Sequence, residues 1–262
     1  MQKRLFLFFS ILTGLFYFSC NFVKTNQIQN ERIKYELPEI LDSSAIVSHY
    51  AYTLNYKEKY EQAEWVAYLL TKDMITGEEE RENNFRIDSS VVTGSANPDD
   101  YKYSGYDKGH LAAAADMSWS KEAMSESFFM SNMSPQSPGF NRGIWKKLEK
   151  LVRTFAEKYD SIYVATGPIL KAGLPTIGKD SVAVPESYYK VIVVYRKAEQ
   201  EHEQDMGIGF ILPNESSNKK LEDFAVPIDS VEHLTEINFF AKIPRKIQER
   251  IECECDIKQW IK

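Results

Sequence analysis

The chain has 262 residues, of which 43% are hydrophobic and 13% aromatic, so it can bury a sizeable core and is not a disordered protein. Its formal net charge is −6, which argues against a domain that binds nucleic acid over most of its surface, because such domains are usually basic. An enzyme needs only a local positive patch, so this charge does not exclude one that acts on a charged polymer.

The first twenty residues have the pattern of an export signal. Lys3 and Arg4 precede a largely apolar run, 5–18, that is too short for a comfortable membrane span. Ser19 then precedes Cys20, as at a bacterial lipoprotein cleavage site, although the aromatic residues just before Ser19 depart from that pattern. We expect an exported protein, either an outer-membrane or cell-surface lipoprotein attached through lipidated Cys20, or a periplasmic or secreted one. An ordinary cleaved signal and an N-terminal anchor are the alternatives.

A polar tether is predicted over 21–45, and a single folded domain over 46–262. Internal repeats and low-complexity tracts that would divide this domain are not found in the sequence. Aromatic residues at 49–56 and a continuous apolar run at 65–70 predict strands. Charged residues at 76–84 and a Gly-, Asn- and Pro-containing stretch at 94–105 predict loops.

The most regular pattern follows at 141–159, where apolar residues recur at helical spacing over about five turns. Strands are expected at 161–166, 188–195 and 206–212, and helices at 230–234 and after Pro244. Strands and helices do not strictly alternate, which predicts an α+β domain on a largely antiparallel sheet.

Only Cys253 and Cys255 follow Cys20, so a disulfide framework does not hold this fold. The pair forms either a strained local disulfide or two thiols. A metal site is less favoured, because no nearby Cys or His completes a ligand set.

His110 is the first candidate for chemistry. It follows Asp107, Lys108 and Gly109, and the glycine would let a backbone or a phosphate approach closely. Neutral imidazole can take a proton from water near neutral pH. A buried histidine whose two nitrogens are satisfied is the alternative interpretation.

Asn141 and Glu149 are a second candidate pair. Asn141 is also suited to be a helix N-cap, and Glu149 to pair with Lys146 or Arg153 on the helix surface. Eight helical residues give roughly 80° of rotation and about 12 Å of rise, so the two side chains are too far apart to bind one ion directly. The functional version is Asn141 as an oxygen ligand and Glu149 acting through metal-bound water, which suits Mg²⁺.

The same helix is the most basic stretch of the chain, and its polar face suits either a phosphate backbone or plain solvent. Its basic residues are Arg142, Lys146, Lys147, Lys150 and Arg153.

Taken in order, four segments resemble the DNA/RNA non-specific endonuclease family of ββα-metal (His-Me finger) nucleases, which includes endonuclease G. The resemblance covers roughly residues 46–245, and the ordered combination is specific although each piece is weak. The segments are Asn83-Asn84-Phe85-Arg86, Tyr106-Asp107-Lys108-Gly109-His110-Leu111-Ala112, Ser131-Asn132-Met133-Ser134-Pro135-Gln136, and Asn141 to Glu149.

The resemblance implies a His-Me finger fold, with a central, mostly antiparallel sheet flanked by helices and a ββα-metal motif. It implies that His110 is the general base, that Asn141 binds Mg²⁺ or Mn²⁺, and that Glu149 holds the water shell of the metal. Asn132 would lie beside the histidine, while Arg86, Lys108 and Arg142 would contact the phosphate. DNA and RNA would be cleaved without sequence specificity to leave 5′-phosphate and 3′-hydroxyl ends, and family members are often homodimers.

One position departs from the family, which has arginine where this chain has Lys108. Lysine keeps the charge but loses the planar fork that binds phosphate through two hydrogen bonds. Two alternatives to a nuclease follow: a catalytically weak or inactive nucleic-acid-binding surface lipoprotein, and a phosphodiesterase for small nucleotides.

Overall fold

The computed structural model describes residues 32–196 and 205–261, and the chain from Ile33 onward forms one compact unit. The expected export signal, Cys20 and the first part of the expected tether lie outside the described residues.

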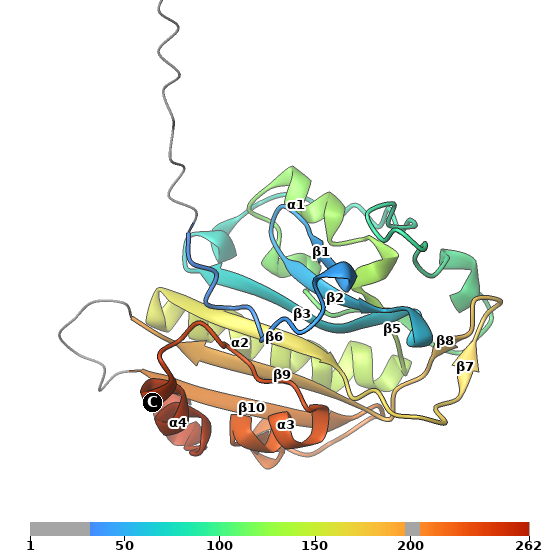
Figure 1. Cartoon of the computed structure of the whole chain (residues 1–262). Helices are drawn as coiled ribbons and strands as arrows, with labels where there is room; N and C mark the ends of the chain where they lie inside the picture. Colours follow the sequence, from blue (N-terminus) through green and yellow to red (C-terminus); the bar gives the residue numbers. More distant parts are fainter. Residues whose placement is uncertain (1–31, 197–204, 262) are drawn as a thin grey trace, which may run out of the picture. The chain divides into compact units, whose positions relative to one another are not determined.

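A seven-stranded antiparallel sheet organises this unit (Figure 1). In spatial order its strands are β1 (Ile46–Ser48), β2 (Thr53–Lys57), β3 (Gln62–Thr71), β6 (Ser161–Pro168), β9 (Ser187–Val194), β10 (Met206–Pro213) and β11 (Ala225–Val226).

The central strands carry long apolar stretches because both faces of the sheet are covered. In β3, Val66 and Tyr68 pack into one core while Trp65 and Ala67 pack into the other. Successive side chains of a strand point to opposite faces. A strand covered on both faces therefore does not show the alternation of apolar and polar residues that a solvated face produces. This explains the continuous apolar run at 65–70.

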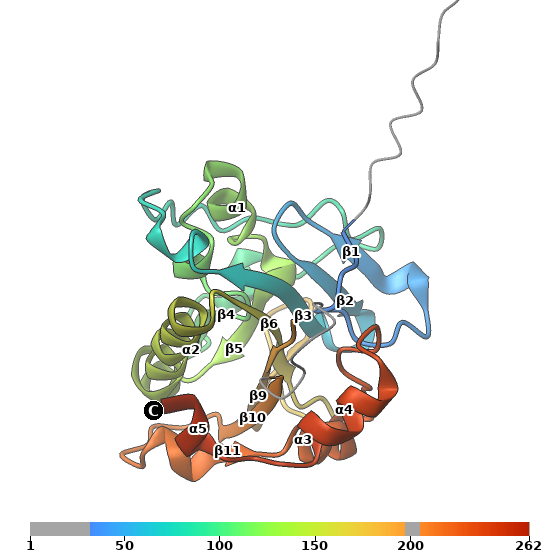
Figure 2. The ribbon, with the colours of Figure 1, turned by 90° about the vertical axis from the view of Figure 1, so that its left-hand side faces the viewer.

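Helices supply the two covers. The amphipathic helix α2 (Lys146–Tyr159) packs Leu148, Val152 and Phe155 into the first core. Helices α3 (Ile228–Thr235) and α4 (Arg245–Glu252) pack against the second, and Figure 2 shows them across the sheet from α2. Two short helices, α1 (Lys121–Glu126) and α5 (Ile257–Ile261), complete the set of α-helices among the described residues.

A separate two-stranded hairpin lies on the α2 side of the sheet. It pairs β4 (Asp107–His110) with β5 (Met133–Gln136), and its register places His110 opposite Met133. Along the chain β4 is followed by β5 and then by α2, which is the order of a ββα motif, and α1 lies in the connection between the two strands. A smaller pair joins β7 (Thr176–Ile177) to β8 (Val182–Ala183).

The α+β class and the antiparallel sheet are confirmed. The strands expected at 65–70, 161–166, 188–195 and 206–212 and the helices near 230 and 245 are present. The segment 49–56 begins with the turn that follows β1, and only its second half, from Thr53, belongs to a strand, β2. The hairpin strands β4 and β5 were not expected as strands, since their residues are small or polar.

The helix expected from Asn141 begins differently. Residues Phe140–Trp145 form a π-helical turn, which leaves helical backbone angles at Gly143, and the regular α-helix starts at Lys146. Asn141 is therefore not the N-cap of α2, and the rotation expected from one continuous helix does not apply.

The packed unit also starts earlier than the boundary expected at residue 46. Tyr35 and Leu37 are buried in the second core, and the Glu39 N–H donates to the carbonyl of Asn238 at 2.8 Å. Residues 33–45 thus belong to the fold rather than to a tether.

Two smaller findings concern function. Cys253 and Cys255 are both free thiols, so the local disulfide is not formed. Over the part of the chain that the structure describes, no helix combines the length and the apolar character needed to cross a membrane.

The N-terminal boundary can be tested with two leucines four residues apart. Leu37 is 6% exposed and Leu41 is 88% exposed. We expect Leu37→Ala to lower the free energy of unfolding by about 2 kcal/mol, because it leaves a cavity in the core. Leu41→Ala should change it by less than about 0.5 kcal/mol. Urea unfolding measures both changes. Equally small decreases in the free energy of unfolding would mean that the tether extends to residue 45, as the sequence predicted.

Candidate active site

One cavity of about 370 Å³ collects most of the candidate residues. The hairpin, the π-helical turn, α2 and the loop that carries Arg81 all contribute to its walls. The lining residues are Arg81, Lys108, His110, Ala113, Ala114, Ala115, Asn141, Arg142, Lys146, Glu149 and Arg153.

His110 lies at the end of β4 with its ring enclosed by aromatic side chains. The rings of Phe85 and Phe128 meet it edge-on, with centroids at 5.7 and 4.9 Å. Its Nε2 is buried and has no hydrogen-bond partner among the described residues. Burial, reinforced by the positive charge of Arg81, lowers the pKa of His110 to about 3. The imidazole is therefore neutral at physiological pH, which is the state that can accept a proton.

Asn132 fixes the backbone next to that histidine. Its side-chain oxygen accepts from the N–H of Ala112 at 2.9 Å, and its amide group donates to the carbonyls of Ala112 and Ser127. The residue is fully buried, so it cannot touch a substrate. The structure thus gives Asn132 a positioning role, with its backbone carbonyl also accepting from the N–H of Leu111.

Gly109 serves the hairpin rather than the cavity. A side chain at this position would collide with the buried side chain of Gln136, which lies across the hairpin on β5. The glycine therefore allows two strands to pack closely, and not the close approach of a phosphate that the sequence suggested.

Asp107 orients the amide of Asn141. It accepts one hydrogen bond from Nδ2 of Asn141 at 2.9 Å and two from the guanidinium of Arg142 at 2.8 and 2.6 Å. Burial would raise the pKa of Asp107, but these hydrogen bonds outweigh it and hold the pKa below its usual value. A carboxylate only accepts, so the NH₂ of Asn141 must face it, and Oδ1 is left available to a ligand.

Glu149 lies in the first turn of α2, and the buried charges of Lys190 and Asp116 act on it. Burial raises the pKa of its carboxyl group, against the opposing charge of Lys190. The expected surface pair with Arg153 is not formed, because Arg153 donates to Asp116 at 2.7 Å.

Lys190 is a site residue that the sequence analysis missed. It is 1% exposed on β9, and its Nζ lies 3.4 Å from the carbonyl of Leu111 and 4.8 Å from the ring centroid of Trp145. Burial lowers its pKa, while Glu149 and Asp116 oppose that effect. The sequence did contain an indication of this residue, because Lys190 is a single cation among the apolar residues of a strand. A charge in such a position is tolerated only when it has a partner.

The arginine assigned to the phosphate is not in the cavity. Arg86 donates to the carbonyl of Ser125 at 2.8 Å, and its guanidinium lies 4.0 Å from the ring centroid of Phe129. Arg81 lines the cavity instead, and its charge acts on both His110 and Glu149. Arg81 stands in a run of charged residues that the sequence suggested was only a loop.

Lys108 does line the cavity, with its Nζ 5.2 Å from the ring centroid of Phe85. Together with Arg81, Arg142, Lys146 and Arg153 it gives the cavity five cationic side chains against one acid, Glu149. This is the local positive patch that the acidic chain needs in order to bind a polyanion.

The donors at the cavity fit a hard divalent cation. Oδ1 of Asn141 is kept available by Asp107, and the carboxylate of Glu149 adds a second oxygen donor. Oxygen donors suit Mg²⁺ or Mn²⁺, while a site for a softer metal would need thiolate or several imidazole ligands.

Comparison with known proteins gives the site a context. The family model described as DNA/RNA non-specific endonuclease matches residues 29–246. Human mitochondrial endonuclease G is 35% identical over 230 residues, covering 81% of this chain and 74% of the human protein. A nuclease of Nostoc is 34% identical, covering 78% of this chain and 76% of its own length.

The fold agrees with a solved relative. A crystal structure of an EndoG/EndoGI complex contains a chain that superposes with a TM-score of 0.72 at 33% sequence identity. The match covers 81% of this chain and 91% of the other.

The lowered pKa of His110 predicts a specific dependence of stability on pH. In the unfolded chain the histidine takes up a proton near pH 6.5, but in the folded protein only near pH 3. Stability is therefore lost as pH falls below 6.5, and by pH 5 the loss due to His110 is about 2 kcal/mol.

Urea unfolding at pH 7 and pH 5, in chelator, measures this for the wild type and for His110→Gln. The wild type should lose about 2 kcal/mol more than the variant over this interval. Equal losses in the two proteins would mean that the folded protein accommodates a charged His110.

Proposed function

The chain belongs to the DNA/RNA non-specific endonuclease family, and we propose on this premise that its cavity hydrolyses the phosphodiester bonds of DNA and RNA without reading their sequence. Family membership makes the protein an endonuclease, a hydrolase of nucleic acids. The observation that supports the detailed proposal is that a neutral His110 and the oxygen of Asn141 open onto one cavity walled by cations.

His110 is the general base in this proposal. Because Nε2 is enclosed, the proton of the attacking water goes to Nδ1. A pKa near 3 describes the protein without substrate. An arriving phosphodiester carries negative charge, which offsets Arg81 and raises the pKa toward the range that proton transfer requires.

Asn141 would hold a divalent cation, Mg²⁺ or Mn²⁺, and Glu149 would accept hydrogen bonds from water bound to it. When bound, the cation supplies stabilisation of the charge that develops on the phosphate and the leaving 3′ oxygen. Asp107 keeps the Asn141 oxygen available, and the charge of Lys190 favours the ionised form of the half-buried Glu149.

The cationic side chains would hold the substrate by its backbone. Phosphate contacts fix position and carry no sequence information, which agrees with cleavage that is independent of sequence. Arg81 takes the role that the sequence analysis gave to Arg86, because its charge lies beside the proposed base.

We also propose that the protein is exported, and that Cys20 is the site of lipid attachment. The support is the basic start, the short apolar run and the Ser19-Cys20 pair. Mass spectrometry of the native N-terminus tests this, since a mature chain that does not begin at a lipidated Cys20 contradicts the lipoprotein form.

Two variants separate the base from the metal ligand. His110→Ala should lower the rate of plasmid nicking at least about 100-fold at any metal concentration, because proton transfer is lost. Asn141→Ala should raise the Mg²⁺ concentration needed for half-maximal activity, because a ligand is lost. Nicking assays with titrated Mg²⁺ and with chelator measure both effects.

The alternatives give different results in the same assay. A wild type that leaves plasmid intact with every divalent metal but still retards it in a gel is a binding protein. One that cleaves a dinucleotide faster than long DNA is a small-substrate phosphodiesterase.

The choice between the two arginines is testable directly. Arg81→Ala should lower the cleavage rate about 100-fold, because a positive charge beside the reacting phosphate is removed. Arg86→Ala is the matched control, and its rate should change less than about threefold at a temperature where the variant is folded. If Arg86→Ala instead lowers the cleavage rate more than Arg81→Ala does, Arg86 is the residue that contacts the phosphate.

A further inference from the structure

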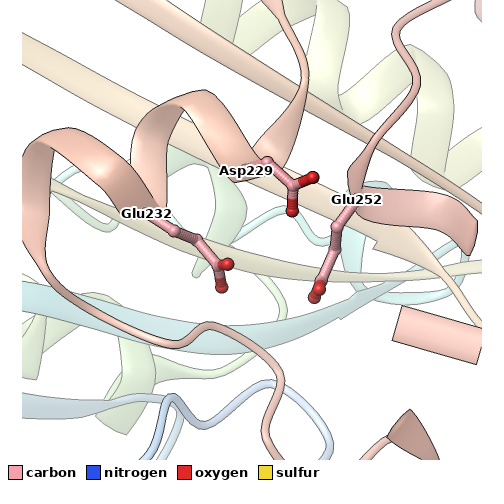
Figure 3. A group of neighbouring side chains, drawn as sticks. All are labelled: Asp229, Glu232 and Glu252. Carbon is pink, nitrogen blue, oxygen red and sulfur yellow. The ribbon is translucent and has the colours of Figure 1, made fainter. Parts of the chain in front are cut away.

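A second group of chemically active side chains lies on the opposite face of the sheet from α2. Asp229 and Glu232 of α3 and Glu252 at the end of α4 point toward one another (Figure 3). One oxygen from each carboxylate lies within 4.8 Å of the other two. They line a cavity of about 630 Å³ that shares no lining residue with the active site.

Glu252 is the unusual member of this acidic cluster of Asp229, Glu232 and Glu252. It is only 5% exposed, and its Oε1 is buried with no hydrogen-bond partner in the described parts of the chain. A buried carboxylate oxygen without a partner costs free energy, so such an atom is normally satisfied by a water or an ion. In Figure 3 this carboxylate is directed at the other two.

The protein supplies little positive charge to this cavity. Among the described lining residues Arg245 is the single cation, and it is 88% exposed and paired with Glu249 at 2.9 Å. Burial raises the pKa of Glu252 to about 8, with further contributions from the charges of Glu232 and Asp229. Burial likewise raises the pKa of Glu232 to about 7. Either protons or a bound cation must therefore neutralise the cluster.

The residues around the cluster offer further oxygen atoms that could complete a coordination shell. Glu232 uses Oε1 to accept from the N–H of Phe239 at 2.7 Å, which leaves its second oxygen. Asn238 lines the same cavity and donates its Nδ2 to Glu39, which leaves its amide oxygen.

We propose that Asp229, Glu232 and Glu252 bind a hard divalent cation, calcium in preference to magnesium, at a structural site distinct from the catalytic centre. Calcium takes six to eight oxygen ligands at about 2.3–2.6 Å, so oxygens on opposite sides of the ion lie up to about 5 Å apart. Magnesium requires a tighter, near-octahedral shell that three converging carboxylates do not readily provide.

The ion would join two helices whose facing carboxylates otherwise repel one another. It would also fix the segment between them, since Phe239 donates to Glu232 and the carbonyl of Asn238 accepts from Glu39. Calcium at this site therefore stabilises the fold and leaves the chemistry of the cavity beside His110 unchanged.

Calorimetric titration and thermal unfolding of the full-length protein at about pH 8 test this, with calcium chloride as the probe. The Asn141→Ala background removes the metal ligand of the active site. We expect one calcium ion per chain, and about 5 mM calcium should raise the melting temperature by about 5 °C relative to chelator. The same concentration of magnesium should give a clearly smaller rise.

Glu252→Gln is the diagnostic variant. It should weaken calcium binding at least about tenfold, yet raise the melting temperature in chelator, because it removes an uncompensated buried charge. Glu254→Gln is the matched control just beyond α4, where the side chain is exposed and outside this cavity, and its calcium response should equal that of the parent.

The proposal fails if the parent protein takes up no calcium, or if Glu252→Gln binds calcium as tightly as the parent. A higher melting temperature for Glu252→Gln in chelator without any calcium response of the parent would mean that the cluster is neutralised by protons alone. Plasmid nicking by Glu252→Gln in the unmodified background should match the wild type. Loss of the calcium site is thereby distinguishable from failure of the proposed nuclease mechanism.

Discussion

The buried amide of Asn132 is the constraint on which the active site depends. Its three hydrogen bonds to the backbone of Ala112 and Ser127 tie the end of β4 to the turn before β5. The hairpin has few apolar side chains of its own to fix its position, so polar bonds to buried backbone groups do this work. These bonds therefore fix the position of His110, which lies two residues before Ala112.

The cavity combines an apolar environment around His110 with a positively charged wall beside it. Aromatic rings enclose His110 and keep it neutral, while the cationic walls beside it favour a polyanion. The formal net charge of −6 is thus no obstacle, because the field at the cavity is set by its own lining, in which five cations face one acid. Lys190, buried nearby, limits the cost of the Glu149 carboxylate in α2, whereas the negative charge of Asp116 adds to that cost.

Periodicity predicted the regular elements well, because β3, β9 and α2 each bury long apolar sets against the sheet. It could not predict the π-helical turn at Phe140–Trp145, which keeps the same residues in sequence but turns Asn141 toward Asp107. Motif order singled out His110, Lys108, Asn141 and Glu149, and all four line one cavity. It also named Arg86, which does not line the cavity, and it did not single out Arg81, because a motif in the sequence does not show which way a guanidinium points. The early start of the fold was missed because Tyr35 and Leu37 have mostly polar neighbours in the sequence. They are buried only by contacts with residues far away along the chain.

The burial of Tyr35 and Leu37 also decides how mechanical load would enter the protein. A pull on the chain before Ile33 would meet the core of α3 and α4 first, through these two side chains and the bond from Glu39 to Asn238. The hairpin and α2 lie across the sheet from that seam (Figure 2). A pull on the N-terminal end is therefore borne first by the face of the sheet opposite the active site.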